Sequence, residues 1–311
     1  MTTEYHNPVM LAECIDGLAL KPGGVYVDVT FGGGGHSRAI LDALPPDEKG
    51  QPGRLLVFDQ DPDARANAAT INDPRLTFIA ANFRNLKRYL RLYGVRQVDG
   101  ILADLGISSH QIDTPERGFS TRFQADLDMR MNQQGDLTAQ QVVNSYPEAD
   151  LHRILGMYGE LTNARTAAAA LVSARANQTI QTINDLKDGL KRCAPRGKEN
   201  KYFAQVFQAL RIEVNDELKV LEEFLEQTPE VLSPGGRLVV MSYHSLEDRL
   251  VKNFINKGKF SGEVEKDLFG NELKPLQSVT RKPLEASADE VAANPRARSA
   301  KLRIGEKINV K

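Results

Sequence analysis

The sequence lacks the features of membrane, secreted and disulfide-stabilised proteins. No apolar run approaches the roughly 18–20 residues that span a bilayer, and the polar start has neither the basic nor the apolar segment of a signal peptide. Cysteine is scarce: Cys14 and Cys193 are 179 positions apart, so neither a metal-binding pair nor a disulfide framework is expected. These absences predict a cytoplasmic protein in a reducing compartment, with no membrane partner.

An excess of charge of either sign is also missing. The 40 basic residues oppose 41 acidic ones, so the formal net charge is −1. A polyanionic partner must therefore be held by a local patch and not by the charge of the whole molecule. Hydrophobic residues make up 41% and charged residues 26% of the 311 positions. This composition excludes wholesale disorder, and the length predicts two domains or one domain with a large insertion.

Short apolar runs alternate with helical stretches in the first part of the chain. Four runs indicate buried strands: 25–29, 55–58, 76–79 and 98–103. Helical segments fit between them at 37–44, 63–71 and 84–93. This alternation predicts an α/β fold in which helices cover both faces of a parallel sheet.

The alternation stops for roughly ninety residues, too many for a loop in a compact sheet. The interruption contains no convincing strand but has helical patterns at 138–157, 163–176 and 182–193. We therefore expect an inserted helical subdomain over 110–202, and a core formed by 1–109 and 203–311.

The strand and helix patterns return after the insertion. Apolar residues from Phe207 to Leu225 recur at helical spacing, which predicts one amphipathic helix. Strands are expected at 237–242 and 300–304, with a mixed loop over about 257–295 between them.

A glycine-rich turn follows the first predicted strand. The stretch Thr30-Phe31-Gly32-Gly33-Gly34-Gly35-His36 leads into a helix, so four residues without a Cβ leave backbone N–H groups open at a helix N-terminus. Asp59 ends the second strand, where an acid reaches the hydroxyls of a bound ribose in doubly wound sheets. Together these features predict an adenosine-containing ligand.

Two cofactors compete for this turn. A dinucleotide fingerprint requires a third glycine in G-x-G-x-x-G, but Ser37 or Arg38 stands at that place. The acidic Asp28 followed by x-Thr-x-Gly-x-Gly is instead similar to the first motif of S-adenosylmethionine-dependent methyltransferases. S-Adenosylmethionine is therefore favoured over NAD.

Residues after the third and fourth strands complete the predicted pocket. The ring of Phe83 is expected to cover an adenine face, with simple core packing as the alternative. Asp104 ends the fourth strand, where a buried strand opens into a ligand cleft. A carboxyl group at such a place favours a functional role over a structural one.

Six short motifs occur in order along the chain. They occupy 30–36, 104–109, 126–131, 207–212, 242–249 and 294–299. Together they resemble the ribosomal RNA small subunit methyltransferase H family, also called MraW, from about His6 to Ile304. The resemblance implies a Rossmann-like class I methyltransferase core with a mostly parallel sheet, interrupted by an all-helical subdomain. It also implies methylation of the 4-amino group of a decoding-centre cytidine in 16S rRNA, within the small ribosomal subunit.

The resemblance further implies a set of S-adenosylmethionine contacts. They are Gly34, Gly35, His36, Asp59, Phe83, Asp104 and Gln111. The chain departs from the family where a proline often follows the paired serines, because His110 stands there.

The implied reaction sets requirements for the catalytic residues. A cytosine amino group is a poor nucleophile, because its lone pair is delocalised into the ring, so the site must accept hydrogen bonds from the amine. We expect this of the loop 104–109, with Asp104, Ser108 and Ser109 as candidates. The base must also leave its stack to reach the methyl group.

Two residues after the fifth strand are candidates for holding the flipped base. Tyr243 offers an aromatic platform, with simple packing as the alternative. His244 is a candidate for contact with the base or a phosphate, although a structural hydrogen-bonded histidine is the more common role.

Basic residues are concentrated in two segments. Six Lys and Arg residues stand against one Glu in 296–311, and six stand against one Asp and one Glu in 187–201. Such segments suit contacts with RNA phosphates, although a solvated charged face is the common alternative. Arg296 and Arg298 are the predicted RNA contacts, and Arg122 and Arg130 are further candidates in the insertion.

Other functions remain open at this stage. The same fold also serves NAD-linked oxidoreductases, but no Tyr-x-x-x-Lys pattern supports that reading. A methyltransferase for another RNA, a protein or a small molecule is a second alternative, and a non-catalytic RNA-binding protein is a third. No cluster of His, Cys, Asp and Glu has ligand-like spacing, so no structural metal is predicted.

Overall fold

Seven strands form one mostly parallel sheet in the computed structural model, which describes residues 8–308. The strands are β1 (Val25–Asp28), β2 (Arg54–Asp59), β3 (Leu76–Ala80), β4 (Val98–Asp104), β5 (Leu232–Ser242), β6 (Leu276–Ser278) and β7 (Lys301–Lys307). Their order in the sheet is β3-β2-β1-β4-β5-β7-β6. The first five are parallel, and β7 is antiparallel to both of its neighbours. The predicted α/β class is confirmed.

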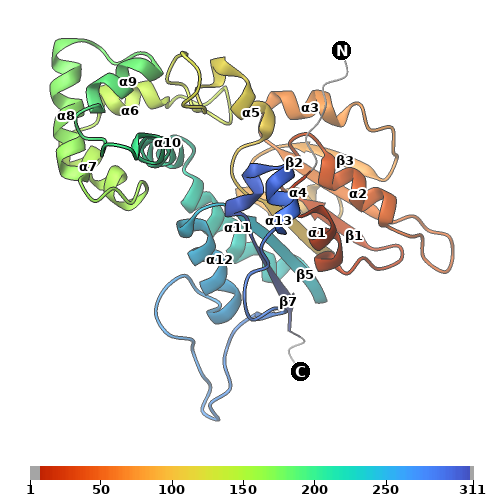
Figure 1. Ribbon diagram of the computed structural model, residues 1–311. Helices are drawn as coiled ribbons and strands as arrows, with labels where there is room; N and C mark the ends of the chain where they lie inside the picture. Colours follow the sequence, from red (N-terminus) through yellow and green to blue (C-terminus); the bar gives the residue numbers. More distant parts are fainter. Residues whose placement is uncertain (1–7, 309–311) are drawn as a thin grey trace. The chain divides into compact units, whose positions relative to one another are not determined.

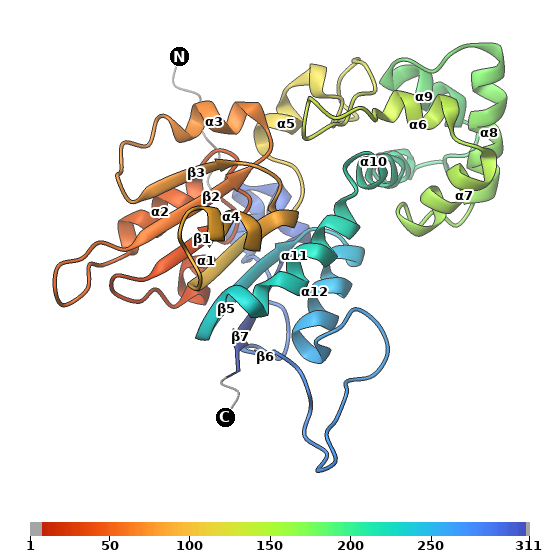
Figure 2. The same ribbon diagram turned by 180° about the vertical axis from the view of Figure 1, so that it is seen from behind.

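Separate hydrophobic cores cover the two faces of the sheet. On one face, α4 (Leu86–Leu92), α11 (Glu217–Val231) and α12 (Ser245–Lys257) pack against strand side chains that include Val27 and Phe58. On the other face, α1 (Leu11–Leu18), α2 (Gly35–Ala43) and α3 (Pro62–Ala68) pack against the alternate set, including Tyr26 and Val57. Figure 1 and Figure 2 show this sheet from opposite sides. Both faces are buried, as a parallel sheet requires.

The chain divides into two units by its internal contacts. The sheet unit comprises the residues up to Gly106 and those from Lys219 onward, and the helical unit comprises Ile107–Leu218. The insertion was expected to end at 202, but the helical unit continues to Leu218. It does so because α10 (Glu199–Asn215) buries Val206, Ala209 and Leu210 in the core of the helices.

The single amphipathic helix expected from Phe207 to Leu225 is wrong. Asp216 adopts a left-handed backbone with φ of 53° and separates α10 from α11. The continuous apolar stripe therefore serves two cores: Phe207 lies in that of the helical unit, whereas Leu221 and Leu225 lie in that of the sheet unit.

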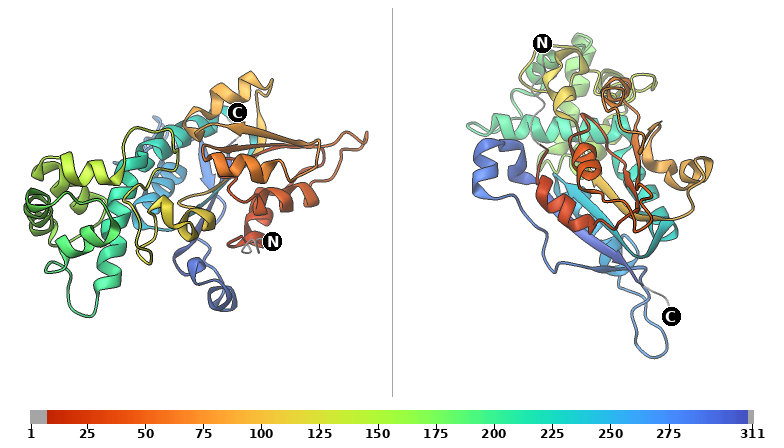
Figure 3. Two further views of the ribbon diagram at one scale, coloured as in Figure 1. Left: turned by 90° about the horizontal axis from the view of Figure 1, so that it is seen from above. Right: turned by 90° about the vertical axis from the view of Figure 1, so that its right-hand side faces the viewer.

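The helical unit is built from α5 (Ser109–Asp113), α6 (Ala139–Ser145), α7 (Glu148–Met157), α8 (Ala164–Asn177), α9 (Ile183–Leu190) and α10. Helix α8 packs on α7 and α9, and α10 packs on α6 and α7. The helix expected over 138–157 is two helices, because Pro147 favours an extended backbone at Tyr146. Figure 3 shows this unit, yellow through green, as helices and loops.

Shorter elements complete the described chain. They are the 3-10 helices η1 (Phe83–Asn85), η2 (Pro115–Arg117) and η3 (Pro295–Ser299), and the helix α13 (Ala288–Ala293). The loop expected over about 257–295 thus contains both β6 and α13. Among residues 8–308, no helix has the length and apolar character needed to cross a membrane.

Candidate active site

The glycine turn joins β1 to α2 at the carboxyl edge of the parallel strands. Gly32 and Gly34 have φ of 52° and 79°, a region that favours glycine. A Cβ built on Gly34 would lie 2.8 Å from the Phe31 ring, and one on Gly35 would lie 2.3 Å from Cγ of Pro8. The absent side chains at these two positions thus make room for the protein's own residues, whereas we had expected them to make room for a ligand.

Asp28 lies in β1 and forms hydrogen bonds at the start of this turn. Its carboxylate accepts hydrogen bonds from the Thr30 backbone N–H at 3.0 Å and from Ser37 Oγ at 2.6 Å. The side chain is buried, and this burial raises the pKa of Asp28. Asp28 therefore connects the end of β1 to the first turn of α2. The sequence did not indicate that Thr30 and Ser37 would be its hydrogen-bond donors.

Asp59 closes the turn from the end of β2. Its Oδ2 accepts from the Gly32 N–H and its Oδ1 from the Asp61 N–H, each at 2.8 Å. Burial raises the pKa of Asp59 from its ordinary value of 3.8 to about 6. The structure thus brings together the two features, glycine turn and acid, from which the adenosine site was predicted.

Phe83 follows β3 and opens η1. Its ring packs edge-on against Phe224 of α11, with the ring centroids 5.2 Å apart. The ring is only partly buried and lies against the core of the sheet. Core packing is therefore observed, and the contact with adenine stays a prediction.

Asp104 lies at the end of β4, beside the glycine turn. Its backbone N–H donates to Thr30 Oγ1 at 2.7 Å, and its Oδ1 accepts from the Tyr243 hydroxyl at 2.8 Å. Its Oδ2 is 3.8 Å from Nδ1 of His36, whose Nε2 lies 3.1 Å from the Val9 carbonyl oxygen. Burial raises the pKa of Asp104 from 3.8 to about 6. Among the predicted site residues, His36, Asp104 and Tyr243 are thus neighbours.

Tyr243 and His244 form the junction between β5 and α12. The Tyr243 N–H donates to Glu247 Oε2 at 3.1 Å, and His244 accepts the Glu247 N–H at its Nδ1, at 3.5 Å. His244 is the N-cap residue of α12. Both residues predicted to contact the base therefore form hydrogen bonds within the sheet unit. His244 has the structural role of a helix cap, which was the alternative to base contact.

Three of the predicted catalytic and cofactor residues belong to the helical unit. Ser108 Oγ accepts the Gln111 N–H at 3.2 Å, and Gln111 Oε1 accepts the Ser108 N–H at 3.0 Å. This reciprocal pair is a capping box at the start of α5, and Ser109 is the first residue of that helix. The Ser-x-x-Gln spacing was visible in the sequence, but we interpreted these residues only as catalytic and cofactor contacts.

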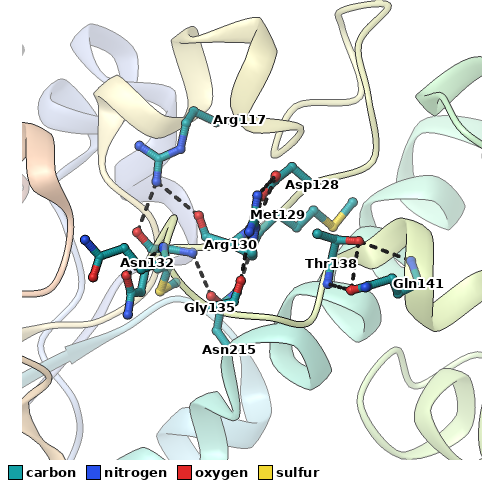
Figure 4. A network of polar contacts seen from close by, with 11 residues as sticks. Arg117, Asp128, Met129, Arg130, Asn132, Gly135, Thr138, Gln141 and Asn215 are labelled. Carbon is teal, nitrogen blue, oxygen red and sulfur yellow. Dashed lines mark hydrogen bonds and ion pairs between the residues drawn. The ribbon is translucent and has the colours of Figure 1, made fainter.

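The motif at 126–131 forms part of a polar network in the helical unit (Figure 4). Arg130 contacts both carboxylate oxygens of Asp128, at 3.0 and 2.6 Å, and donates to the Gly135 carbonyl at 2.8 Å. Arg117 donates to the carbonyls of Arg130 and Met131. Arg130 thus serves the interior of its own unit, and its placement does not support the expected RNA contact.

The basic residues of the two predicted patches differ in their surroundings. In the part of the chain that the structure describes, five exposed cations of the helical unit have no ion-pair partner: Lys191, Arg192, Arg196, Lys198 and Lys201. Lys187, from the same predicted patch, bonds to the Thr121 carbonyl instead. In the sheet unit, Arg298 is exposed and Arg296 is half-buried, both in η3.

Comparison with known proteins identifies the family. Residues 3–308 match the MraW methylase family. Ribosomal RNA small subunit methyltransferase H of Cytophaga hutchinsonii is 59% identical over 97% of this chain and 99% of its own length. The proteins of that name from Flavobacterium johnsoniae and Christiangramia forsetii are 56% and 55% identical over 99% and 98% of this chain, and over 99% and 98% of their own lengths. The chain therefore belongs to the MraW methylase family, as its six motifs indicated.

Proposed function

We propose that this methyltransferase uses S-adenosylmethionine to methylate the exocyclic 4-amino group of a decoding-centre cytidine in 16S rRNA, in the cytoplasm and within the small ribosomal subunit. Family membership and the name shared by the relatives support a substrate in the RNA of that subunit. The six motifs, which resemble this family in order, support the cytidine amine.

One observation carries the choice of cofactor. Three carboxyl groups, those of Asp28, Asp59 and Asp104, surround the glycine turn, and no described Lys or Arg forms an ion pair with any of them. Buried negative charge of this kind repels a pyrophosphate and attracts a cation. S-Adenosylmethionine carries a sulfonium and an ammonium group, so the donor set fits it better than it fits NAD. When bound, it supplies an electrophilic methyl group.

The residues proposed for the cofactor are those that the family resemblance implies. In the sheet unit, Asp59 would receive the ribose hydroxyls, Asp104 and His36 the amino acid part, and Phe83 the adenine ring, beside Gly34 and Gly35. Gln111 is proposed as a further contact on the resemblance alone. Each of these roles follows the family pattern, and for Asp59 and Asp104 it agrees with the charge of the site.

The protein must bind the cofactor and the cytidine, orient the amine toward the methyl group and accept a proton from the amine. Positive charge builds on the amine nitrogen as its lone pair reacts, and an oxygen that accepts a hydrogen bond from the amine stabilises that charge and then takes the proton. We propose the segment 104–109 for this task, with Asp104, Ser108 and Ser109 as candidates. Arg296 and Arg298 would hold RNA phosphates, while Tyr243 and His244 remain candidates for the base.

Calorimetry with the purified protein tests the cofactor. S-Adenosylmethionine should bind and NAD should not. Asp59→Asn should weaken S-adenosylmethionine binding by about 10- to 100-fold, because a charged acceptor of hydrogen bonds is lost. Asp73→Asn removes an acid whose partner is Arg75, 2.7 Å away, and should leave binding unchanged. Tight NAD binding would reverse the choice of cofactor.

Mass spectrometry of rRNA nucleosides tests the substrate. In cells that lack this gene, 16S rRNA should lose one methyl group from the amine of one cytidine, and the purified enzyme should restore it. Unchanged 16S rRNA in the deletion strain would direct the search to another RNA or to a small molecule.

A further inference from the structure

The two carboxylate oxygens of Asp104 have different surroundings. Oδ1 accepts from the Tyr243 hydroxyl at 2.8 Å, whereas among the described residues the polar contact of Oδ2 is with His36 Nδ1, at 3.8 Å. The Val9 carbonyl can only accept a hydrogen bond, so its 3.1 Å contact assigns the hydrogen of a neutral His36 ring to Nε2. The Nδ1 atom then presents a lone pair, and Oδ2 receives no hydrogen bond from the described residues. One oxygen is thus held and the other is open.

The Tyr243 side chain is itself held in place. Its backbone N–H donates to Glu247 Oε2 at 3.1 Å, in the first turn of α12. Its ring packs against the core on the α1 and α2 face of the sheet. Glu247 is buried, with 3% of its surface exposed. The hydroxyl therefore reaches Asp104 from a fixed support.

The groups that face Asp104 are mostly acids or weak acids. They are Asp28 of β1, Glu247 of α12, Cys14 of α1, His36 of α2 and Tyr243. Burial, together with the nearby Asp104, raises the pKa of Tyr243 far above its usual range, so its hydroxyl stays protonated and remains a donor. No Lys or Arg of the described chain forms an ion pair with Asp104.

We propose that Tyr243 is a positioning residue of the donor site: its hydroxyl fixes the Asp104 carboxylate so that Oδ2 receives the cationic end of the methyl donor. The inference rests on the proposed function, and it assigns Tyr243 a role different from the base platform expected from the sequence. The ring need not touch the nucleoside at all, because it acts through Asp104.

Tyr243→Phe removes only the hydroxyl and tests the proposal. Binding of S-adenosylmethionine, measured by calorimetry between pH 5 and 8, should weaken about 10-fold at pH 7, because a hydrogen bond to a charged group is lost. The hydroxyl stabilises the Asp104 carboxylate, so its loss should also shift the acid limb of the binding profile to higher pH. A merely structural tyrosine would not move this limb.

A matched control lies in the helical unit, where Tyr146 donates its hydroxyl to Glu213 Oε1 at 2.9 Å. Tyr146→Phe makes the same change to the same kind of bond and should leave both the dissociation constant and the pH profile unchanged. Thermal melts of the ligand-free variants check that each is folded. A wild-type protein that fails to bind S-adenosylmethionine contradicts the proposed function, whereas an unaltered profile in Tyr243→Phe contradicts this inference alone.

An Asp104→Ala background separates direct from indirect action. If Tyr243 acts through Asp104, adding Tyr243→Phe to Asp104→Ala should cause no further loss of affinity. An additional loss of several-fold would mean that the ring or hydroxyl contacts the donor itself, and would overturn the proposal.

Discussion

The helical unit and the sheet unit both hold charged side chains that are partly shielded from water, but they compensate the charge differently. In the helical unit, the Arg130 guanidinium neutralises Asp128 through three hydrogen bonds (Figure 4). In the sheet unit, Asp28, Asp59 and Asp104 accept hydrogen bonds from backbone amides and hydroxyls only, and Asp104 has an imidazole nitrogen at 3.8 Å. No cation of the described chain pairs with these three at closer range.

This difference separates structural from functional charge. The partly buried Arg130–Asp128 ion pair is compensated within the chain itself, so the 126–131 motif is explained by the loop that it holds. Uncompensated carboxyl groups at one edge of a sheet carry a desolvation cost that a cationic ligand relieves. Both regions carry motifs of the family, so the sequence does not distinguish them. The contacts of their charged side chains do.

The largest expected effect is on catalysis by the sheet unit. Asp104→Asn keeps the shape of the side chain but removes its charge, so methyl transfer to RNA should fall by about 10²- to 10³-fold. Transfer of a labelled methyl group from S-adenosylmethionine to 16S rRNA measures the change. Asp128→Asn is the counterpart in the helical unit and should lower stability while leaving the turnover of the folded enzyme within a few-fold of wild type. Unchanged turnover in Asp104→Asn would remove this residue from the site.

The next effect concerns stability in the helical unit. Arg130→Ala removes the guanidinium that bonds to the Asp128 carboxylate and to the Gly135 carbonyl, and should lower the free energy of unfolding by about 1–3 kcal/mol. Urea denaturation measures it, and the affinity of the folded protein for S-adenosylmethionine should not change.

Arg122→Ala is the matched control for that experiment. This side chain is 62% exposed and pairs with the exposed Asp113, so its loss should cost less than about 1 kcal/mol. Equal losses in the two variants would show that the network around Arg130 contributes no more than a surface ion pair.

Much of the sheet was predictable because its signals are local. Buried parallel strands are continuous apolar runs, so the segment expected at 98–103 appears as Val98–Asp104. The three-residue strand β6 has no such run and was missed. The break at Asp216 was hidden for another reason: the apolar stripe continues past it, and no glycine marks the left-handed residue.

The site was predictable only in part, for a similar reason. Asp59 and Asp104 could be found because each stands at the end of a strand whose limits were clear. The partner of Asp104 could not, since Tyr243 is 139 positions away and meets it only through the pairing of β4 with β5. Arg130 shows the opposite case. The sequence displays a cation that suits RNA, but it does not show that Asp128 of the same motif forms an ion pair with it.

The last expected effect is a dependence of stability on pH that differs in sign between the units. In the ligand-free protein, burial raises the pKa of Asp59 and Asp104 to about 6, so the folded state binds protons that the unfolded state releases. Their contribution to stability is full below about pH 4 and is lost as the pH rises through 6. Asp185, which caps α9, has its pKa lowered by the Thr182 N–H, so its contribution is instead lost on acidification below its ordinary range.

Urea denaturation at pH 7, 6 and 5 measures this dependence. Acidification over that window should stabilise the ligand-free wild type by roughly 2–3 kcal/mol relative to a double variant with Asp59→Asn and Asp104→Asn, whose amides do not titrate. Affinity for S-adenosylmethionine should fall over the same window, because protonation removes the charge that attracts the donor. Asp185→Asn should not alter the difference, since this acid titrates at lower pH. If the double variant kept the full pH dependence of the wild type, ionised Asp59 and Asp104 would not destabilise the folded state. The inference from their lack of a cationic partner would then be wrong.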